Sequence, residues 1–207
     1  MRRGSGYSPP LNLMQEDPSS THDPMDSSFT ALKRGYAHCL TPRERRALLE
    51  LSKLVADSSI GSSEIVAARQ HGHESMDAFL CRFLRARDFC VQKAFSMVKT
   101  HVAWRVREDV SSLANKEEGM VIRDCDVGLV RRLLFPSWVS GFTKEHCPVV
   151  FLQFGRLDAR KLLRLMTLDE IIRLHVWELE QLLRLMAKKT CEEGAYVDRW
   201  VTVCDLK

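Results

Sequence analysis

The sequence predicts a mixed α/β protein, with an all-helical N-terminal part followed by a β-sheet that helices cover. Two apolar stripes at helical spacing occupy residues 76–105. Two short apolar runs, PVVFLQF at 148–154 and RWVTVCDL at 199–206, are typical of strands. A third helical stripe at 168–186 lies between these runs, so we expect the strands to form a sheet against which that helix packs.

The N-terminal 40 residues predict a different state from the rest. Residues 1–40 are rich in Ser, Pro, Gly, Thr and Asp without an apolar period, so we expect a disordered leader. Order is expected to begin at Thr41, which forms a capping box with Glu44 around a proline at the first helical position. This helix should end near Asp57. Polar breaks are expected at 58–63 and 70–74.

Residues 76–107 predict two helices packed as an antiparallel hairpin. The first has apolar residues at i, i+3, i+4, i+7 and i+8, with arginines clustered off this stripe near its end. The second ends on the pair Trp104 and Arg105, and only residues 88–90 connect the two helices. The stripes consist of Met76, Phe79, Leu80, Phe83 and Leu84, then Val91, Ala94, Phe95, Val98 and Val102.

The second half begins with a loop over 115–132 and a short helix that Pro136 ends. Gly155 closes the first strand. Thr167 and Glu170 form a second capping box, and the helix that follows is apolar around much of its circumference. We therefore expect this helix to be largely buried against the sheet.

Composition and charge narrow the class of protein. With 207 residues, 45% of them apolar, the chain can build a real core. The 31 basic and 27 acidic residues leave +4, too small a surplus to indicate a nucleic-acid partner. Seven cysteines without Cys-x-x-Cys spacing indicate a reducing, intracellular setting. No apolar run reaches the roughly 18 residues of a membrane span, so we expect a cytoplasmic protein with at most peripheral membrane contact.

Four segments, in order, resemble the CRAL-TRIO lipid-binding family, specifically its Sec-fourteen-like phosphatidylinositol-transfer branch. They are FLRARDFCVQKAFSMVKTHVAWR at 83–105, PVVFLQFGRLD at 148–158, VWELE at 176–180 and VTVCDLK at 201–207. The resemblance implies a helical N-terminal lobe at 41–135 and, at 136–207, the first part of a bowl-shaped lipid-binding domain. It also implies that the domain is incomplete at Lys207, so we expect exposed strand edges and poor solubility.

The resemblance also implies a site. Arg87 matches the arginine that reaches a phosphoinositide head group, and Pro148 matches a proline that shapes the neighbouring loop. Thr143 replaces an aspartate that accepts from inositol hydroxyls, and the glycine expected three residues later is absent, which matters if that position needs a positive φ. By the same resemblance, tyrosines used against choline correspond to Val139, Val150 and Leu179, and their absence argues against phosphatidylcholine binding. Val150, Trp177 and Leu179 are candidates for pocket or core lining.

The implied function is non-enzymatic binding of phosphatidylinositol, with its transfer or presentation through transient contact with Golgi or endosomal membranes. No cofactor besides the phospholipid is expected. Two alternatives remain: a protein-interaction module that has lost its lipid pocket, and a carrier of another hydrophobic ligand such as a sterol or tocopherol-like molecule.

Other polar residues leave similar choices open. Arg87 is either a phosphate ligand or a surface residue that forms an ion pair with Asp88 or Glu108. Glu178 is either a buried partner for an arginine or exposed. His71 and His73 are expected to form a solvated loop rather than a metal site, and Cys147 beside His146 is not expected to be catalytic. Trp104 and Trp177 are expected to be core anchors.

Overall fold

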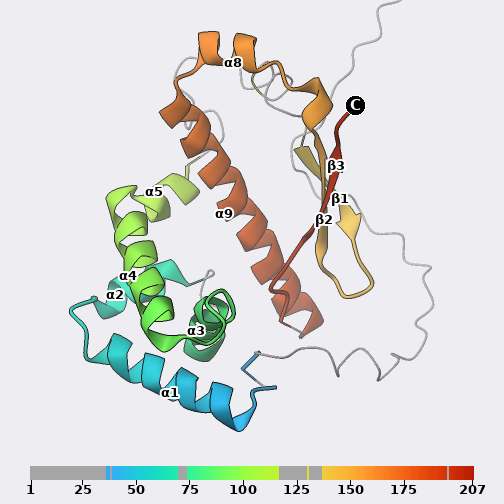
Figure 1. Cartoon of the computed structure of the whole chain (residues 1–207). Helices are drawn as coiled ribbons and strands as arrows, with labels where there is room; N and C mark the ends of the chain where they lie inside the picture. The colour runs from blue at the N-terminus through green and yellow to red at the C-terminus, as the bar shows by residue number, and fades with distance from the viewer. Residues whose placement is uncertain (1–35, 38, 70–73, 117–129, 131–136, 195) are drawn as a thin grey trace, which may run out of the picture.

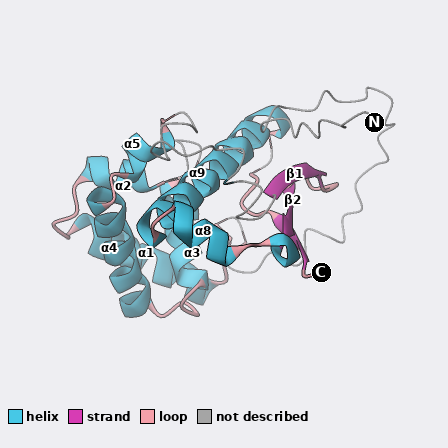
Figure 2. Ribbon diagram, turned by 90° about the horizontal axis from the view of Figure 1, so that it is seen from above, coloured by secondary structure: helices cyan, strands magenta, loops and turns pink. Residues whose placement is uncertain are grey.

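The computed structural model describes residues 36–37, 39–69, 74–116, 130, 137–194 and 196–207 (Figure 1). A helical lobe, α1 to α5, lies on one side of the long helix α9, and a three-stranded sheet lies on the other (Figures 1 and 2). The mixed α/β class is therefore confirmed. The expected loop and helix at 115–136, the histidines at 71 and 73, and residues 1–35 lie mostly or wholly outside the described residues.

The helical lobe follows the sequence prediction closely where apolar stripes are long. Helix α1, Pro42–Ala56, starts at Thr41 with the expected capping box, and Asp57 caps its end. Helices α3, Met76–Arg85, and α4, Val91–Arg107, form the expected pair. The short helices α2, Ser62–Ala68, and α5, Val110–Ala114, were not predicted, because seven and five residues are too few to show a period.

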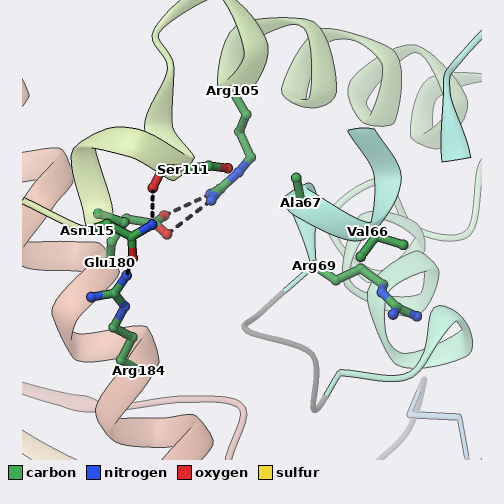
Figure 3. Close-up of a pocket in the computed structure, with 9 residues that line it drawn as sticks. Val66, Ala67, Arg69, Arg105, Ser111, Asn115, Glu180 and Arg184 are labelled. Atoms are coloured by element: carbon green, nitrogen blue, oxygen red, sulfur yellow. Dashed lines mark hydrogen bonds and ion pairs between the residues drawn. The ribbon is translucent and has the colours of Figure 1, made fainter. Parts of the chain in front are cut away.

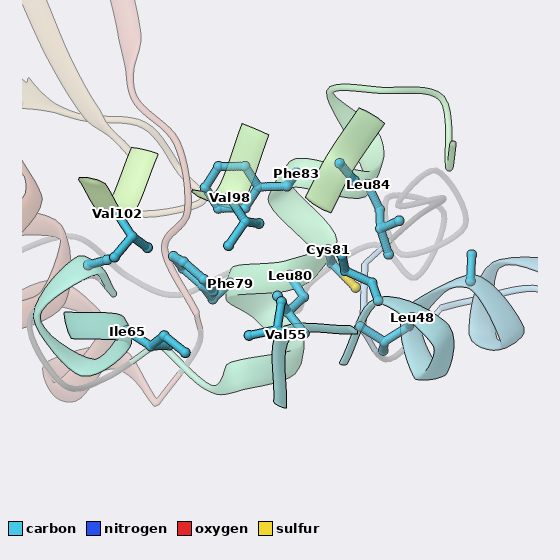
Figure 4. Packing of buried hydrophobic residues seen from close by; sticks show 14 of the residues in the cluster. Leu48, Val55, Ile65, Phe79, Leu80, Cys81, Phe83, Leu84, Val98 and Val102 are labelled. Carbon is cyan, nitrogen blue, oxygen red and sulfur yellow. The ribbon is translucent and has the colours of Figure 1, made fainter. Parts of the chain in front are cut away.

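The core of the lobe lies where α1, α2, α3 and α4 meet (Figure 4). Phe79, Leu80 and Leu84 of α3 are fully buried there. Full burial of one such side chain stabilises the fold by about 1.5–3 kcal/mol. Packing also reaches back before α1, since Leu40 is buried in this core and Tyr36 lies against Arg85. Ordered contacts therefore begin no later in the chain than Tyr36, which is before the expected start at Thr41.

The sheet consists of β1, Ser137–Phe142, β2, Pro148–Gln153, and β3, Val201–Asp205. Strand β1 pairs antiparallel with β2, and β2 pairs parallel with β3, so the sheet is mixed. Both strands expected from the sequence are confirmed, whereas β1, with the sequence SWVSGF, is too rich in Ser and Gly to stand out. After β2 a 3-10 turn, η2, Phe154–Arg156, begins. A Cβ at Gly155 would overlap the backbone of Lys207.

Helix α8, Ala159–Leu165, precedes α9, Leu168–Glu193. Helix α9 begins with the predicted capping box of Thr167 and Glu170 and ends at Gly194 in the left-handed conformation that glycine favours. The expectation that α9 is largely buried is wrong for part of its surface, because Leu168 and Ile172 are 62% and 51% exposed. Three strands are too narrow a sheet to cover that side of a 26-residue helix.

The tight turn between β1 and β2 contains a strained residue. Thr143 N–H donates to the Cys147 carbonyl at 2.9 Å, and the Thr143 hydroxyl accepts from the backbone of Glu145 and Cys147. His146 within the turn has φ +60°, the left-handed region. This position is where the sequence comparison expected a glycine, and the structure confirms that it takes a positive φ.

We predict that His146→Gly raises the free energy of unfolding by about 0.5–1 kcal/mol, since a left-handed non-glycine residue costs about 1–2 kcal/mol. The contact of His146 Nδ1 with Glu193 at 3.2 Å is partly exposed, so its loss offsets little. Urea denaturation measures the change. His146→Ala is the control, because it loses the same contact but keeps the strain; a glycine variant no more stable than the alanine variant would contradict the prediction.

Candidate functional site

The first feature of the site region is an ion pair that joins the two lobes. Arg105 Nη1 and Nη2 of α4 donate to the two carboxylate oxygens of Glu180 on α9, at 2.8 and 3.0 Å (Figure 3). The two side chains are only 11% and 5% exposed. The bidentate geometry is the arrangement in which guanidinium and carboxylate bind most strongly.

The sequence left two roles open for Glu178, a buried partner for an arginine or an exposed residue, and in the structure the buried partner is Glu180 instead. Glu178 lies near His175 on α9 and keeps 21% of its side chain exposed. Glu180 lies on the same face of the helix as Trp177, three residues earlier, and that face meets the helical lobe. The helical period could have selected Glu180 because it puts residues three apart side by side.

The same face of α9 binds the end of α5. Trp177 Nε1 donates to the Lys116 carbonyl at 2.9 Å, and Gln181 Nε2 donates to the Ala114 carbonyl at 2.9 Å. Arg184 donates to the side-chain oxygen of Asn115. Gln181 satisfies a carbonyl that the C-terminus of α5 leaves without a partner, and Arg184 and Trp177 bind the two residues that follow, so α9 caps the end of α5 from the side. Trp177 is 7% exposed and is a core anchor, as expected.

A second polar cluster connects α3 to the segment between α9 and β3. Glu74 is 1% exposed and binds Arg82 through two contacts of 2.6 and 2.9 Å. Tyr196 donates its hydroxyl to Glu74 at 3.1 Å. Burial, reinforced by Glu74, raises the pKa of Tyr196, so its hydroxyl stays protonated and able to donate.

The cluster continues at the start of the described chain. Arg85 lies 4.0 Å from the ring centre of Tyr36 and 3.6 Å from the Asp198 carboxylate. Arg199 donates to the Tyr36 hydroxyl at 2.7 Å and to Asp198 at 3.2 Å. Together these contacts attach the residues just before β3 to the helical lobe.

The opposite side of α9 and the sheet are apolar but poorly covered. Leu182, Leu183 and Met186 pack against Cys147 and Val197, the residues that precede β2 and β3. On β3 itself Val201 and Val203 are 42% and 40% exposed. Most of the exposed large apolar side chains in the described residues lie after the helical lobe in sequence, within 142–206: Phe142, Phe154, Leu157, Leu163, Leu165, Leu168, Ile172, Trp200, Val201, Val203 and Leu206.

The candidate head-group residues lie on different elements of the structure. Arg87 follows α3, is exposed, and donates only to the adjacent Ala86 carbonyl in the contacts described, at 2.8 Å. Glu108, one of the two ion-pair partners expected for Arg87 as an alternative, binds Arg107 instead. Thr143 lies in the β1–β2 turn, and Pro148 is buried at the first position of β2.

The candidate lining residues divide between two places. Val150 on β2 is half-buried and pairs in register with Val139 on β1 and Thr202 on β3. Leu179 is half-buried on the side of α9 that carries Leu182 and Met186. Trp177 instead faces the helical lobe. Val150 and Leu179 thus belong to the sheet side, where the poorly covered apolar residues lie.

Among the described residues, no group of His, Cys, Asp and Glu is arranged to hold a metal ion. Cys147 is buried and lies 3.6 Å from the Glu145 carbonyl, while His146 contacts Glu193. The two neighbours thus have separate partners. In the described part of the chain no helix is long and apolar enough to cross a bilayer.

Two family models match the chain in sequence order. Residues 47–100 match the CRAL/TRIO N-terminal domain and residues 135–207 match the CRAL/TRIO domain. The first match covers most of the helical lobe, and the second begins just before β1.

Several curated proteins are similar to the chain. The CRAL-TRIO domain-containing protein T23G5.2 of Caenorhabditis elegans is 30% identical over 162 residues, 78% of this chain and 21% of that protein. Protein real-time of Anopheles gambiae is 29% identical over 198 residues, 87% of this chain and 28% of that protein. The phosphatidylinositol/phosphatidylcholine transfer protein SFH7 of Arabidopsis thaliana is 30% identical over 139 residues, 65% of this chain and 24% of that protein. The chain thus spans about a quarter of the length of these relatives.

We predict that Glu180→Gln lowers the free energy of unfolding by about 3–5 kcal/mol, because it leaves the buried Arg105 charge without its partner. Chemical denaturation measures the loss. Glu178→Gln is the matched control, two positions away on the same helix and more exposed, and should change stability by less than about 0.5 kcal/mol. Equal effects of the two substitutions would show that the ion pair does not connect the lobes.

Two histidines should change stability with pH in opposite directions. Burial, with Arg105 and Arg82 nearby, lowers the pKa of His101, although Glu180 and a hydrogen bond with Ala68 oppose this. A hydrogen bond between His175 and Glu178 raises the pKa of His175. As the pH falls below about 6.5, the unfolded chain binds a proton at His101 that the folded protein does not, so stability falls. The contribution of His175 is present at low pH and is lost as the pH rises through its raised pKa.

Denaturation between pH 5 and pH 8 tests this pair. His101→Gln should make the protein less sensitive to acid, whereas His175→Gln should make it more sensitive. Identical pH profiles for the two variants would contradict the assignment.

Proposed function

Because this chain belongs to the CRAL-TRIO family, through its CRAL/TRIO N-terminal domain and CRAL/TRIO domain, we propose that it binds phosphatidylinositol and transfers or presents it between membranes without catalysing a reaction. A relative that shares 30% identity carries the name phosphatidylinositol/phosphatidylcholine transfer protein. The single observation that supports the proposal best is the concentration of exposed apolar side chains in the second domain.

Exposed apolar surface of this kind suits a lipid. Val201 and Val203 on β3 and Ile172 on α9 are between 40% and 51% exposed. Such side chains gain about 25 cal/mol for each Å² that an acyl chain removes from water. An acyl chain moving from a bilayer to this surface exchanges one apolar environment for another, so extraction costs little. The contact with the membrane is proposed to be transient and peripheral, at the cytoplasmic face of Golgi or endosomal membranes.

Arg87 is the proposed phosphate ligand. The turn that follows it holds Asp88 and Phe89 at φ +49° and +57°. A bulky side chain in this region is strained, and such strain is often retained where function requires a particular backbone path. The guanidinium is exposed and makes no described ion pair, so it remains able to bind a phosphodiester. Thr143 and Pro148 are proposed to shape the head-group side, and Val150 and Leu179 the acyl side.

A second candidate, a protein-interaction module without a lipid pocket, is favoured by a different observation. The two hollows described between the helices measure about 180 and 50 Å³ and are lined by arginines. Neither is an apolar cavity of the size that a lipid requires.

We predict that the chain retains phosphatidylinositol and that Arg87→Ala weakens this binding about tenfold, the effect of one charge-assisted hydrogen bond. The free energy of unfolding should change by less than about 0.5 kcal/mol, because Arg87 is exposed. Native mass spectrometry with organic extraction identifies the lipid, and transfer of labelled phosphatidylinositol between vesicles measures the loss. Arg107→Ala, another exposed arginine of the lobe, is the control.

The outcomes separate the hypotheses. A folded chain that holds no lipid and transfers none supports the interaction module. A retained sterol or tocopherol-like molecule, with no dependence on Arg87, identifies a carrier of a phosphate-free ligand. Equal transfer by the Arg87 and Arg107 variants removes Arg87 from the site.

A further inference from the structure

A hollow lies between α2, α4, α5 and α9, and Figure 3 shows the residues that line it. Its volume is about 180 Å³, and its charged lining consists of Arg69, Arg105, Arg184 and Glu180. We propose that this hollow binds a phosphate-type oxyanion, a site independent of the proposed lipid function.

The charges in the hollow are unbalanced. Both carboxylate oxygens of Glu180 bind the Nη atoms of Arg105. Arg184 donates to the neutral side chain of Asn115, and neither it nor Arg69 forms an ion pair with a described carboxylate. Among the described residues, the lining of the hollow therefore holds three arginines and one glutamate. An anion supplies the missing negative charge, and its attraction to the guanidinium groups is stronger in a partly enclosed hollow than on the open surface.

Buried donors in the lining also lack partners. The Nε atoms of Arg69 and Arg105 are buried and have no hydrogen-bond partner in the structure. Donors in this state are unfavourable, and native proteins satisfy nearly all of them. A tetrahedral oxyanion presents several acceptor oxygens in different directions, which matches donors that come from separate helices. Guanidinium groups bind phosphate in this way, through parallel N–H donors.

Size and access fit a small solute. The volume is many times the roughly 10–15 Å³ that one water occupies by the same kind of measure. Ser111 and Asn115 at the lining are exposed, so the hollow opens to solvent. The arginines in the lining disfavour an acyl chain, because their donors would be left unpaired.

A smaller adjoining hollow provides a reporter. It measures about 50 Å³, shares Arg69, Arg105 and Glu180 with the first, and adds Arg82 and His101. His101 Nε2 is buried without a partner. The charged groups that act on His101 are Arg82 from α3, Arg105 from its own helix and Glu180 from α9. An anion beside Arg105 should raise the pKa of His101, since it offsets the positive charges that disfavour the protonated ring.

The first experiment is isothermal titration calorimetry of inorganic phosphate into the 207-residue chain, at constant ionic strength. We expect saturable binding that Arg184→Gln weakens tenfold or more. Arg107→Gln is the matched control, because Arg107 is 70% exposed and pairs with Glu108 outside the hollow. Phosphate binding that is equally strong in both variants overturns the proposal. The proposal is also overturned if the unsubstituted chain binds neither phosphate nor any of the further probes described below.

Nuclear magnetic resonance keeps the test independent of whether a variant folds. Phosphate should raise the pKa of His101 in the unsubstituted chain and leave that of His175 unchanged. Binding heat without a change at His101 places the anion elsewhere and overturns the proposal.

Further probes identify the source of the phosphate. Glycerol 3-phosphate tests a soluble monoester, and phosphatidylcholine vesicles with and without phosphatidylinositol 4-phosphate test a lipid head group. Dependence on Arg184 in the soluble arm supports a metabolite or free phosphate, and dependence in the vesicle arm alone supports a head group. Loss of phosphatidylinositol transfer in Arg87→Ala with phosphate binding retained would show that the two sites are separate.

Discussion

The buried ion pair of Arg105 and Glu180 constrains the rest of the structure, because neither charge is stable in that position without the other. The pair fixes α9 against α4 at one rotation about its axis. That rotation directs Trp177 and Gln181 to the end of α5. It also turns the side that bears Leu182 and Met186 away from the helical lobe and toward the residues that lead into β2 and β3. A single electrostatic contact thus decides which face of α9 is available to the sheet.

Elements with strong local signals could be predicted from the sequence. Capping boxes at Thr41 and Thr167 marked the starts of α1 and α9, and long apolar stripes marked α3 and α4. Elements held mainly by their neighbours could not be predicted. Strand β1 forms because β2 pairs with it, and α5 is held by donors on α9 that are distant in sequence.

The site shows the same division between local and long-range information. A strained position at His146 could be anticipated from one expected glycine, because backbone conformation is a local property. The partner of Arg105 could not be identified from the sequence, since choosing between Glu178 and Glu180 requires the orientation of α9. The arginine-lined hollow was not anticipated at all. Its lining comes from four helices, and two of these, α2 and α5, are too short to be recognised in the sequence.

The contacts of Tyr36 and Tyr196 carry a consequence for the order of folding. Tyr36 and Arg199 are 163 residues apart, and Tyr196 and Glu74 are 122 apart, whereas the core of the helical lobe uses contacts between neighbouring helices. Local contacts form early, because they close short loops, and distant ones wait for the chain between them to be ordered. On the ribosome the lobe can therefore gather around α3 before β3 has been synthesised. The contacts of Tyr36 with Arg199 and of Glu74 with Tyr196 form only after the residues before β3 have been synthesised, so the two ends of the described chain are joined late.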